Sequence, residues 1–172
     1  MERLRHPLGR SRHAGVRRRL LHPHLPRAPL ADLVSGTTPF ERVGGRETVE
    51  AIVETFYAAA AADAPLRAIY PDDLAPSREK LALFFEQWLG GEPRYSQRYG
   101  HPRLRRRHFP FVIAEHHAQA WLTHMRAALE SQNVTGEEFE AIWGRLEPLA
   151  HHMVNAHEDV PREPLPDDAR LT

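Results

Sequence analysis

The 172-residue chain contains no cysteine. This absence excludes disulfide scaffolds, cysteine-ligated zinc, iron–sulfur clusters and cysteine nucleophiles. Long apolar runs are also missing, because no stretch reaches the ~18 residues that a membrane span requires. The first residues lack the ~7–15-residue apolar segment of a secretory signal. We therefore expect a cytoplasmic protein without a membrane span.

The chain has no formal net charge, because Lys and Arg total 23 and Asp and Glu total 23. The two signs are nevertheless unevenly placed. Residues 1–36 carry eight arginines against two acidic residues, a balance of +6, and residues 37–172 carry −6. We expect residues 1–36 to form a basic, disordered tail, since they have too little apolar surface for a core.

The basic tail leaves three other interpretations open. It could be a polybasic arm for anionic surfaces, a transit-like segment, or the product of a start site chosen too far upstream. Nucleic-acid binding is expected only through this segment. Residues 37–158 are expected to form one folded domain, and residues 159–172, rich in Pro and Asp, a flexible C-terminal tail.

Apolar residues recur with helical spacing in four later segments, which predicts an all-α domain. The segment that begins near residue 46 has an apolar face at Val49, Ile52, Val53, Phe56, Tyr57 and Ala60. Further helices are expected from about Ser77 to Leu89, from Glu115 to Ser131, and from Thr135 to Met153. Thr38 followed by Pro39 predicts a short capped helix before them. No strand alternation or internal repeat is present.

Residues 92–112 show no clear period beyond a turn near 104–108, so they are expected to form a long irregular connection. Connections of this length in a compact domain are usually functional. His108 lies in this segment, after Arg105, Arg106 and Arg107. By itself such a histidine is more often a core or capping residue than a ligand, and the arginines are more often solvated cations than contacts for a partner.

The 12 histidines do not form a metal-binding pattern. The pairs 116–117 and 151–152 are adjacent, and neighbours on a helix point about 100° apart, so they chelate poorly. Tyr57, Tyr70 and Trp121 offer another kind of site. They could be core residues with single hydrogen bonds, or donors that converge in an apolar pocket to bind an anion or a polarised diatomic ligand.

Several sequence blocks, in order over residues 38–156, resemble the group II truncated haemoglobins. The most specific block is residues 100–111 (GHPRLRRRHFPF), supported by residues 84–91 (FFEQWLGG) and 120–122 (AWL). The resemblance implies a two-over-two helical sandwich around haem b. It also accounts for the irregular connection, because an extended segment largely replaces one helix of the globin fold in this family.

The resemblance assigns a role to each site residue. His108 corresponds to the proximal iron ligand, and its second ring nitrogen is expected to donate to a backbone carbonyl. The residues that correspond to the distal, ligand-stabilising positions are Tyr57, Tyr70, Trp121, Leu81 and Ser77. Those that correspond to haem-propionate contacts are Lys80, Tyr95 and His101.

These residues predict reversible binding of O₂, and also of CO or NO, with tight binding and slow release. The resemblance favours an oxygen-binding protein over a dedicated enzyme. Two alternatives remain open: an NO dioxygenase or peroxidase-like enzyme that uses the same haem and an external reductase, and a haem-free helical sensor or adaptor. A homo-oligomer is compatible with each of these functions.

Overall fold

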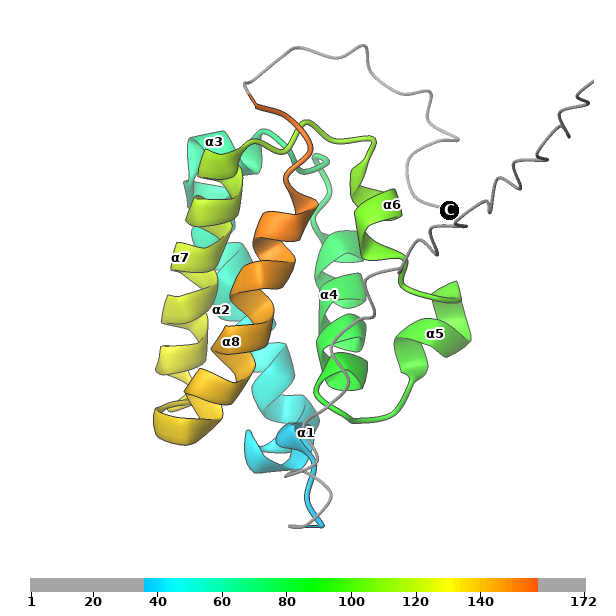
Figure 1. Cartoon of the computed structure of the whole chain (residues 1–172), viewed down its shortest axis with the longest axis vertical. Coiled ribbons are helices and arrows are strands. Elements are labelled where there is room, and N and C mark those ends of the chain that lie inside the picture. Colours follow the sequence, from blue (N-terminus) through cyan, green and yellow to red (C-terminus); the bar gives the residue numbers. More distant parts are fainter. Residues whose placement is uncertain (1–35, 158–172) are drawn as a thin grey trace, which may run out of the picture.

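The computed structural model describes residues 36–157 (Figure 1). All regular structure in this range is helical, which confirms the predicted all-α fold class. Four long helices form the body: α2 (Gly45–Ala62), α4 (Ala75–Trp88), α7 (Glu115–Ser131) and α8 (Gly136–Met153). Four short helices accompany them: α1 (Pro39–Arg42), α3 (Ala64–Arg67), α5 (Arg94–Tyr99) and α6 (Leu104–His108). The tails predicted at 1–36 and 159–172 lie almost wholly outside the described residues.

The long helices form two antiparallel pairs, α2 with α4 and α7 with α8. Helix α2 packs on both α4 and α7, and α7 packs on α8. Figure 1 shows α8 crossing in front of α2, with α7 on one side of it and α4 on the other. Helices α4 and α8 have little direct contact with each other. Between residues 36 and 157, no helix is both long and apolar enough to cross a membrane.

Helix α2 forms the centre of the core, as its sequence period predicts. All six residues of the expected apolar face are buried, and Ile52 and Phe56 are fully inaccessible. The helix ends at Ala62, and the side chain of the next residue, Asp63, accepts a hydrogen bond from the Leu66 backbone N–H at 3.0 Å and so caps α3. Leu66 is fully buried, which fixes the corner between α2 and α4.

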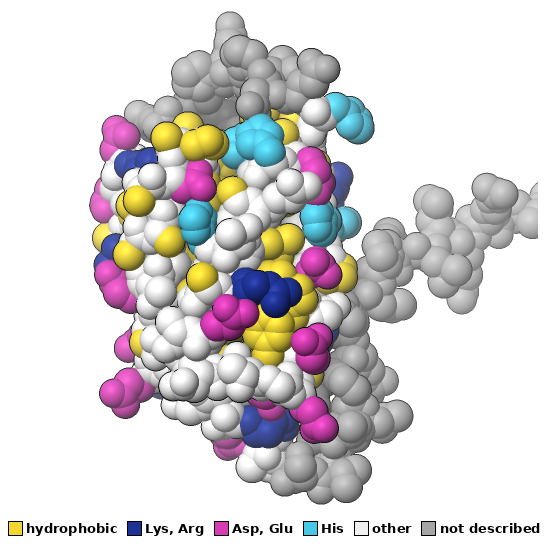
Figure 2. Space-filling model, turned by 90° about the vertical axis from the view of Figure 1, so that its left-hand side faces the viewer, with side chains coloured by type: hydrophobic (Ala, Val, Ile, Leu, Met, Phe, Trp, Pro, Cys, Tyr) yellow, Lys and Arg dark blue, Asp and Glu magenta, His cyan; other side chains and the backbone are white. Residues whose placement is uncertain are grey.

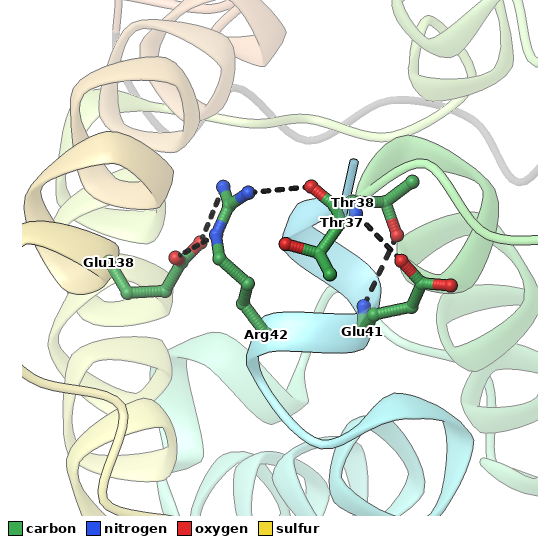
Figure 3. A network of polar contacts seen from close by, with 5 residues as sticks. All are labelled: Thr37, Thr38, Glu41, Arg42 and Glu138. Atoms are coloured by element: carbon green, nitrogen blue, oxygen red, sulfur yellow. Dashed lines mark hydrogen bonds and ion pairs between the residues drawn. The ribbon is translucent and has the colours of Figure 1, made fainter. Parts of the chain in front are cut away.

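The short helix α1 begins with the predicted cap (Figure 3). The Thr38 hydroxyl accepts from the Glu41 backbone N–H at 3.2 Å, and the Glu41 carboxylate accepts from the Thr38 N–H at 2.8 Å. These reciprocal bonds form a capping box. Arg42 then joins α1 to α8 through an ion pair with Glu138 at 2.5 Å. The first described residues are thereby attached to the last long helix.

The connection at 92–112 is more regular than its sequence predicts. It contains the helix α5 as well as α6, where only a turn was expected. The sequence of α5, RYSQRY, has no apolar period, and Tyr95 is its one buried residue. A single buried side chain in six residues is too little for periodicity to detect. Helix α4 also begins at Ala75, two residues earlier than expected, since Asp73 accepts from the Ala75 N–H.

A buried carboxylate attaches α5 to the rest of the fold. Glu86 is 3% exposed and forms ion pairs with Arg46 at 3.0 Å and Arg94 at 3.5 Å. These contacts join α4 to the first turn of α2 and to the first residue of α5. Gly91 lies against the same group, because a Cβ atom built there would be 2.9 Å from the Glu86 carbonyl oxygen. The turn at this point therefore requires glycine.

Candidate functional site

A cavity of about 230 Å³ opens between α4 and α8, where these two helices have little direct contact. Its wall is mostly apolar, and it includes eight of the nine residues that were predicted from the sequence as site residues. The lining residues that α4 contributes are Ser77, Lys80, Leu81, Phe84 and Phe85; those from α8 are Leu146, Leu149, Ala150 and Met153. Residues far apart in the sequence thus surround one space.

His108, the last residue of α6, lines this cavity. Its Nδ1 lies 2.7 Å from the Leu104 carbonyl oxygen, one helical turn earlier, so Nδ1 carries the proton and donates. Burial lowers the pKa of the imidazole, which keeps the ring neutral. The other nitrogen, Nε2, has no hydrogen bond within the described part of the chain. A neutral imidazole held in one tautomer with Nε2 available is suited to ligate a metal ion.

Tyr57 from α2, Tyr70 from the corner after α3, and Trp121 from α7 also line the cavity. The rings of the two tyrosines meet edge to face, with centroids 5.7 Å apart. In Figure 1, α7 lies on the other side of α8 from α6, and α2 lies behind α8. The predicted set of donors is therefore brought together, and it faces the cavity from a different wall than His108.

The two tyrosine hydroxyls stay protonated over a wide pH range. Burial raises the pKa of Tyr70 to about 12, against the opposing effect of its hydrogen bonds with Trp121 and Tyr57. Burial raises the pKa of Tyr57 further, and the neighbouring Tyr70 adds to this increase. Both groups remain neutral O–H donors at physiological pH.

The α4 residues predicted for this wall occupy it as well. Ser77 and Leu81 both line the cavity, and the Ser77 hydroxyl acts on Tyr57 through a side-chain hydrogen bond that lowers the pKa of the phenol. Arg78 lies with its guanidinium 6.0 Å from the centre of the Tyr57 ring and forms an ion pair with Glu54 at 2.7 Å. This pair joins α4 to α2 next to the tyrosine.

Two of the three residues predicted to bind propionates line the cavity, namely Lys80 and Tyr95. His101 lies outside it: its side chain is exposed, and its Nδ1 accepts from the Arg103 backbone N–H at 3.1 Å. Arg107 lines the cavity instead, while its guanidinium also donates to the Tyr99 and Pro102 carbonyl oxygens. Burial and the proximity of Arg107 lower the pKa of Lys80. The cationic side chains of Lys80 and Arg107 therefore lie close together at one edge of the cavity.

Several lining residues were not identified from the sequence. His117 is buried and lines the cavity, although most histidines outside 108 were expected at the surface. Its Nδ1 accepts from the Ala114 backbone N–H at 3.1 Å, which caps the start of α7. The available signal was the position of His117 as the third residue of the expected helix, from which a side chain can accept from the N–H of the residue before the helix. Other histidines do gather at the surface near the upper end of the face shown in Figure 2. Among residues 36–157, no group of three or more His, Cys, Asp or Glu side chains is placed to hold a metal ion.

The residues around the cavity fit a planar apolar cofactor that carries a metal ion and carboxylates. His108 offers a nitrogen to the metal, the aromatic and aliphatic wall matches a macrocycle, and Lys80 with Arg107 matches carboxylates at its edge. Together with two antiparallel helix pairs, this cavity defines the class of two-on-two globins.

Comparison with known proteins agrees with this class. The model of the family described as bacterial-like globin matches residues 38–155. The chain is 42% identical over 124 residues to the group 2 truncated hemoglobin YjbI of Bacillus subtilis, covering 72% of this chain and 93% of that protein. The chain belongs to the bacterial-like globin family and is a group II truncated haemoglobin.

Solved structures share the fold as well as the sequence. The truncated oxygen-avid haemoglobin from Bacillus subtilis has a TM-score of 0.66 and 42% identity, with 69% of this chain and 100% of that chain covered. The group II 2-on-2 hemoglobin from Agrobacterium tumefaciens has a TM-score of 0.69 and 36% identity, with 72% and 98% covered. Membership of this family implies haem-based ligand binding.

Proposed function

We propose that this protein binds haem b through Nε2 of His108 and reversibly binds O₂, with tight binding and slow release. Haem supplies a ferrous iron with a free coordination position for a diatomic gas. CO and NO are further ligands of the same position. The observation that carries the proposal is the bond from His108 Nδ1 to the Leu104 carbonyl, since it leaves Nε2 available in the cavity that Tyr57, Tyr70 and Trp121 also line.

The protein's own residues perform three tasks in this function. His108 ligates the iron as a neutral imidazole, and the hydrogen bond to Leu104 fixes the orientation of the ring. Lys80 and Arg107 bind the cofactor's carboxylates at the edge of the cavity. The apolar wall, with Leu81 and Phe84 among its members, excludes water from the cavity.

The donors Tyr57, Tyr70 and Trp121 would slow release of the gas. A hydrogen bond to an acceptor with negative charge contributes about 1.5–3 kcal/mol. One such bond slows dissociation by roughly tenfold to a hundredfold. The three contributions do not simply add, because a diatomic ligand has few lone pairs to accept them. Such slow release suits retention or sensing of O₂ better than its bulk delivery.

Absorption spectra of the purified, haem-loaded protein test this proposal. Ferrous protein under N₂ is expected to change its Soret and visible bands on exposure to O₂ or CO, and to recover when the gas is removed. His108→Ala is expected to lose these spectra, and His152→Ala, which removes an exposed histidine outside the cavity lining, is the control. Unchanged spectra in His108→Ala would overturn the assignment of the iron ligand.

A further inference from the structure

The segment that follows α8 returns to the helix that carries His108. Helix α8 ends at Met153, and residues 154–156 continue in a non-helical conformation. The backbone N–H groups of Asn155 and Ala156 both donate to the Ile113 carbonyl oxygen, at 2.9 and 3.2 Å. Residues separated by about 40 positions are thus paired beside the connection between α6 and α7.

The Asn155 side chain joins the two ends of that connection. Its Nδ2 donates to the His108 backbone carbonyl at 3.0 Å, and its Oδ1 accepts from the Ile113 N–H at 3.2 Å. The His108 carbonyl also accepts from the Phe111 N–H at 3.1 Å. One amide therefore satisfies a backbone acceptor of His108 and a donor of Ile113, five residues apart.

Helix α6 needs such external support. It has five residues, and an isolated helix of this length is not stable in water. At its start, Arg107 donates to the carbonyls of Tyr99 and Pro102. At its end, Asn155 holds His108, and the Arg105 guanidinium contacts the His152 and Val154 carbonyls that α8 leaves open. The end of α8 therefore determines where the last turn of α6 lies.

We propose that Asn155 is a positioning residue for His108: it holds the main chain of the iron-ligating histidine in place against the end of α8. This inference rests on the proposed function of His108 as iron ligand. The imidazole is attached to the backbone that Asn155 binds, and its Nδ1 bond to Leu104 stays inside α6. Movement of α6 relative to α8 therefore moves the ring as a whole, and Asn155 limits this movement.

Two variants separate the two hydrogen bonds of the amide. Asn155→Asp keeps an oxygen for the Ile113 N–H but replaces the donor to the His108 carbonyl by an acceptor, whereas Asn155→Ala removes both bonds. Asn133→Gly is the matched control, since it removes an exposed asparagine at the opposite end of α7 and keeps a residue that accepts its φ of 59°. All three variants are made in the full-length, haem-loaded protein.

Amide hydrogen exchange and resonance Raman spectroscopy give the two readouts. In Asn155→Asp, the Phe111 amide should exchange about fivefold faster, the effect of losing roughly one hydrogen bond, while the Ile113 amide keeps its protection. The iron–histidine stretching band of the ferrous protein should move to lower frequency and broaden in both Asn155 variants. A role confined to stabilising the fold would leave this band in place.

The results distinguish this inference from the proposed function. Wild-type exchange and an unchanged band in Asn155→Asp would overturn the positioning role and leave the His108 assignment intact. An equal change in Asn133→Gly would overturn it too, because the effect would not be specific to Asn155. A wild-type protein without an iron–histidine band would overturn both. Should Asn155→Ala fail to fold, Asn155→Asp with its two readouts decides the question.

Discussion

His124 of α7 and Asp63 at the start of α3 form a hydrogen bond, with Nε2 of the histidine 2.8 Å from Oδ2 of the aspartate. His124 lies one helical turn after Trp121 on α7, and Asp63 caps α3, whose chain continues to Tyr70. The pair therefore joins the element that bears Trp121 to the element that bears Tyr70.

We predict that His124→Leu accelerates O₂ release without abolishing haem binding. Loss of the contact with Asp63 loosens Tyr70 relative to Trp121, and the cost of about one hydrogen bond corresponds to roughly a twofold to fivefold faster rate. Stopped-flow displacement of O₂ by CO measures it. His151→Leu is the control, since it removes a similar pair with Glu115 that does not involve α3. Equal rates in the two variants would refute the role of the His124 pair.

Removing the hydroxyl of either Tyr57 or Tyr70 should have a larger effect. Tyr57→Phe and Tyr70→Phe are each predicted to release O₂ roughly tenfold to a hundredfold faster, because each loses a donor to a charged acceptor. The double variant should fall short of the product of the two single effects, since the tyrosines lie in one network. Tyr99→Phe, whose hydroxyl donates to Glu79 outside the cavity, should match the wild type.

The pH dependence of O₂ release follows from the raised pKa values of these tyrosines. A phenol with an ordinary pKa near 10 would lose its proton, and its capacity to donate, as the pH rises through 10. Because burial raises the pKa of Tyr70 to about 12 and that of Tyr57 further, the release rate should stay constant from about pH 6 to 10. A rise in the rate centred near pH 10 would show that a distal tyrosine ionises there. Rapid pH-jump kinetics measure this.

Two glycine substitutions should change stability in opposite directions. Gly91→Ala places a Cβ atom 2.9 Å from the Glu86 carbonyl oxygen, so it should destabilise the protein by about 1–3 kcal/mol. Gly144→Ala meets nothing within 4 Å on the exposed side of α8 and should stabilise it by about 0.5–1 kcal/mol. Urea unfolding followed by circular dichroism measures both changes, and a stable Gly91→Ala protein would contradict the close approach.

The sequence predicts the body of the fold because the long helices bury many residues at regular spacing. The six apolar positions of α2 are all buried as expected. The spacing of apolar residues does not distinguish Leu81 and Trp121 from core residues, although both are half-buried and line the cavity. Periodicity reports which face of a helix is apolar, and it does not report whether a neighbouring helix or a cavity lies opposite.

The supports of the site were harder to predict than the site itself. Tyr57 and His108 have side chains whose chemistry suggests their role, and the family resemblance identified both. The Asn155 side chain bonds the backbone of His108 and of Ile113, which lie more than 40 residues earlier in the sequence. Arg107 lines the cavity, whereas Arg105, two residues before it, contacts the end of α8. Such roles depend on tertiary placement, which one sequence does not encode as a local pattern. The propionate contacts of Lys80, Tyr95 and His101 remain predictions.

The scarce contact between α4 and α8 also affects how the protein responds to its supply of cofactor. A compact chain without its occupant would keep an apolar hollow between these helices, with fewer dispersion contacts than a closed core has. Any molecule that binds only the folded state raises stability in proportion to the logarithm of its free concentration. The unfolding temperature, and with it resistance to proteolysis, should therefore rise with the supply of haem.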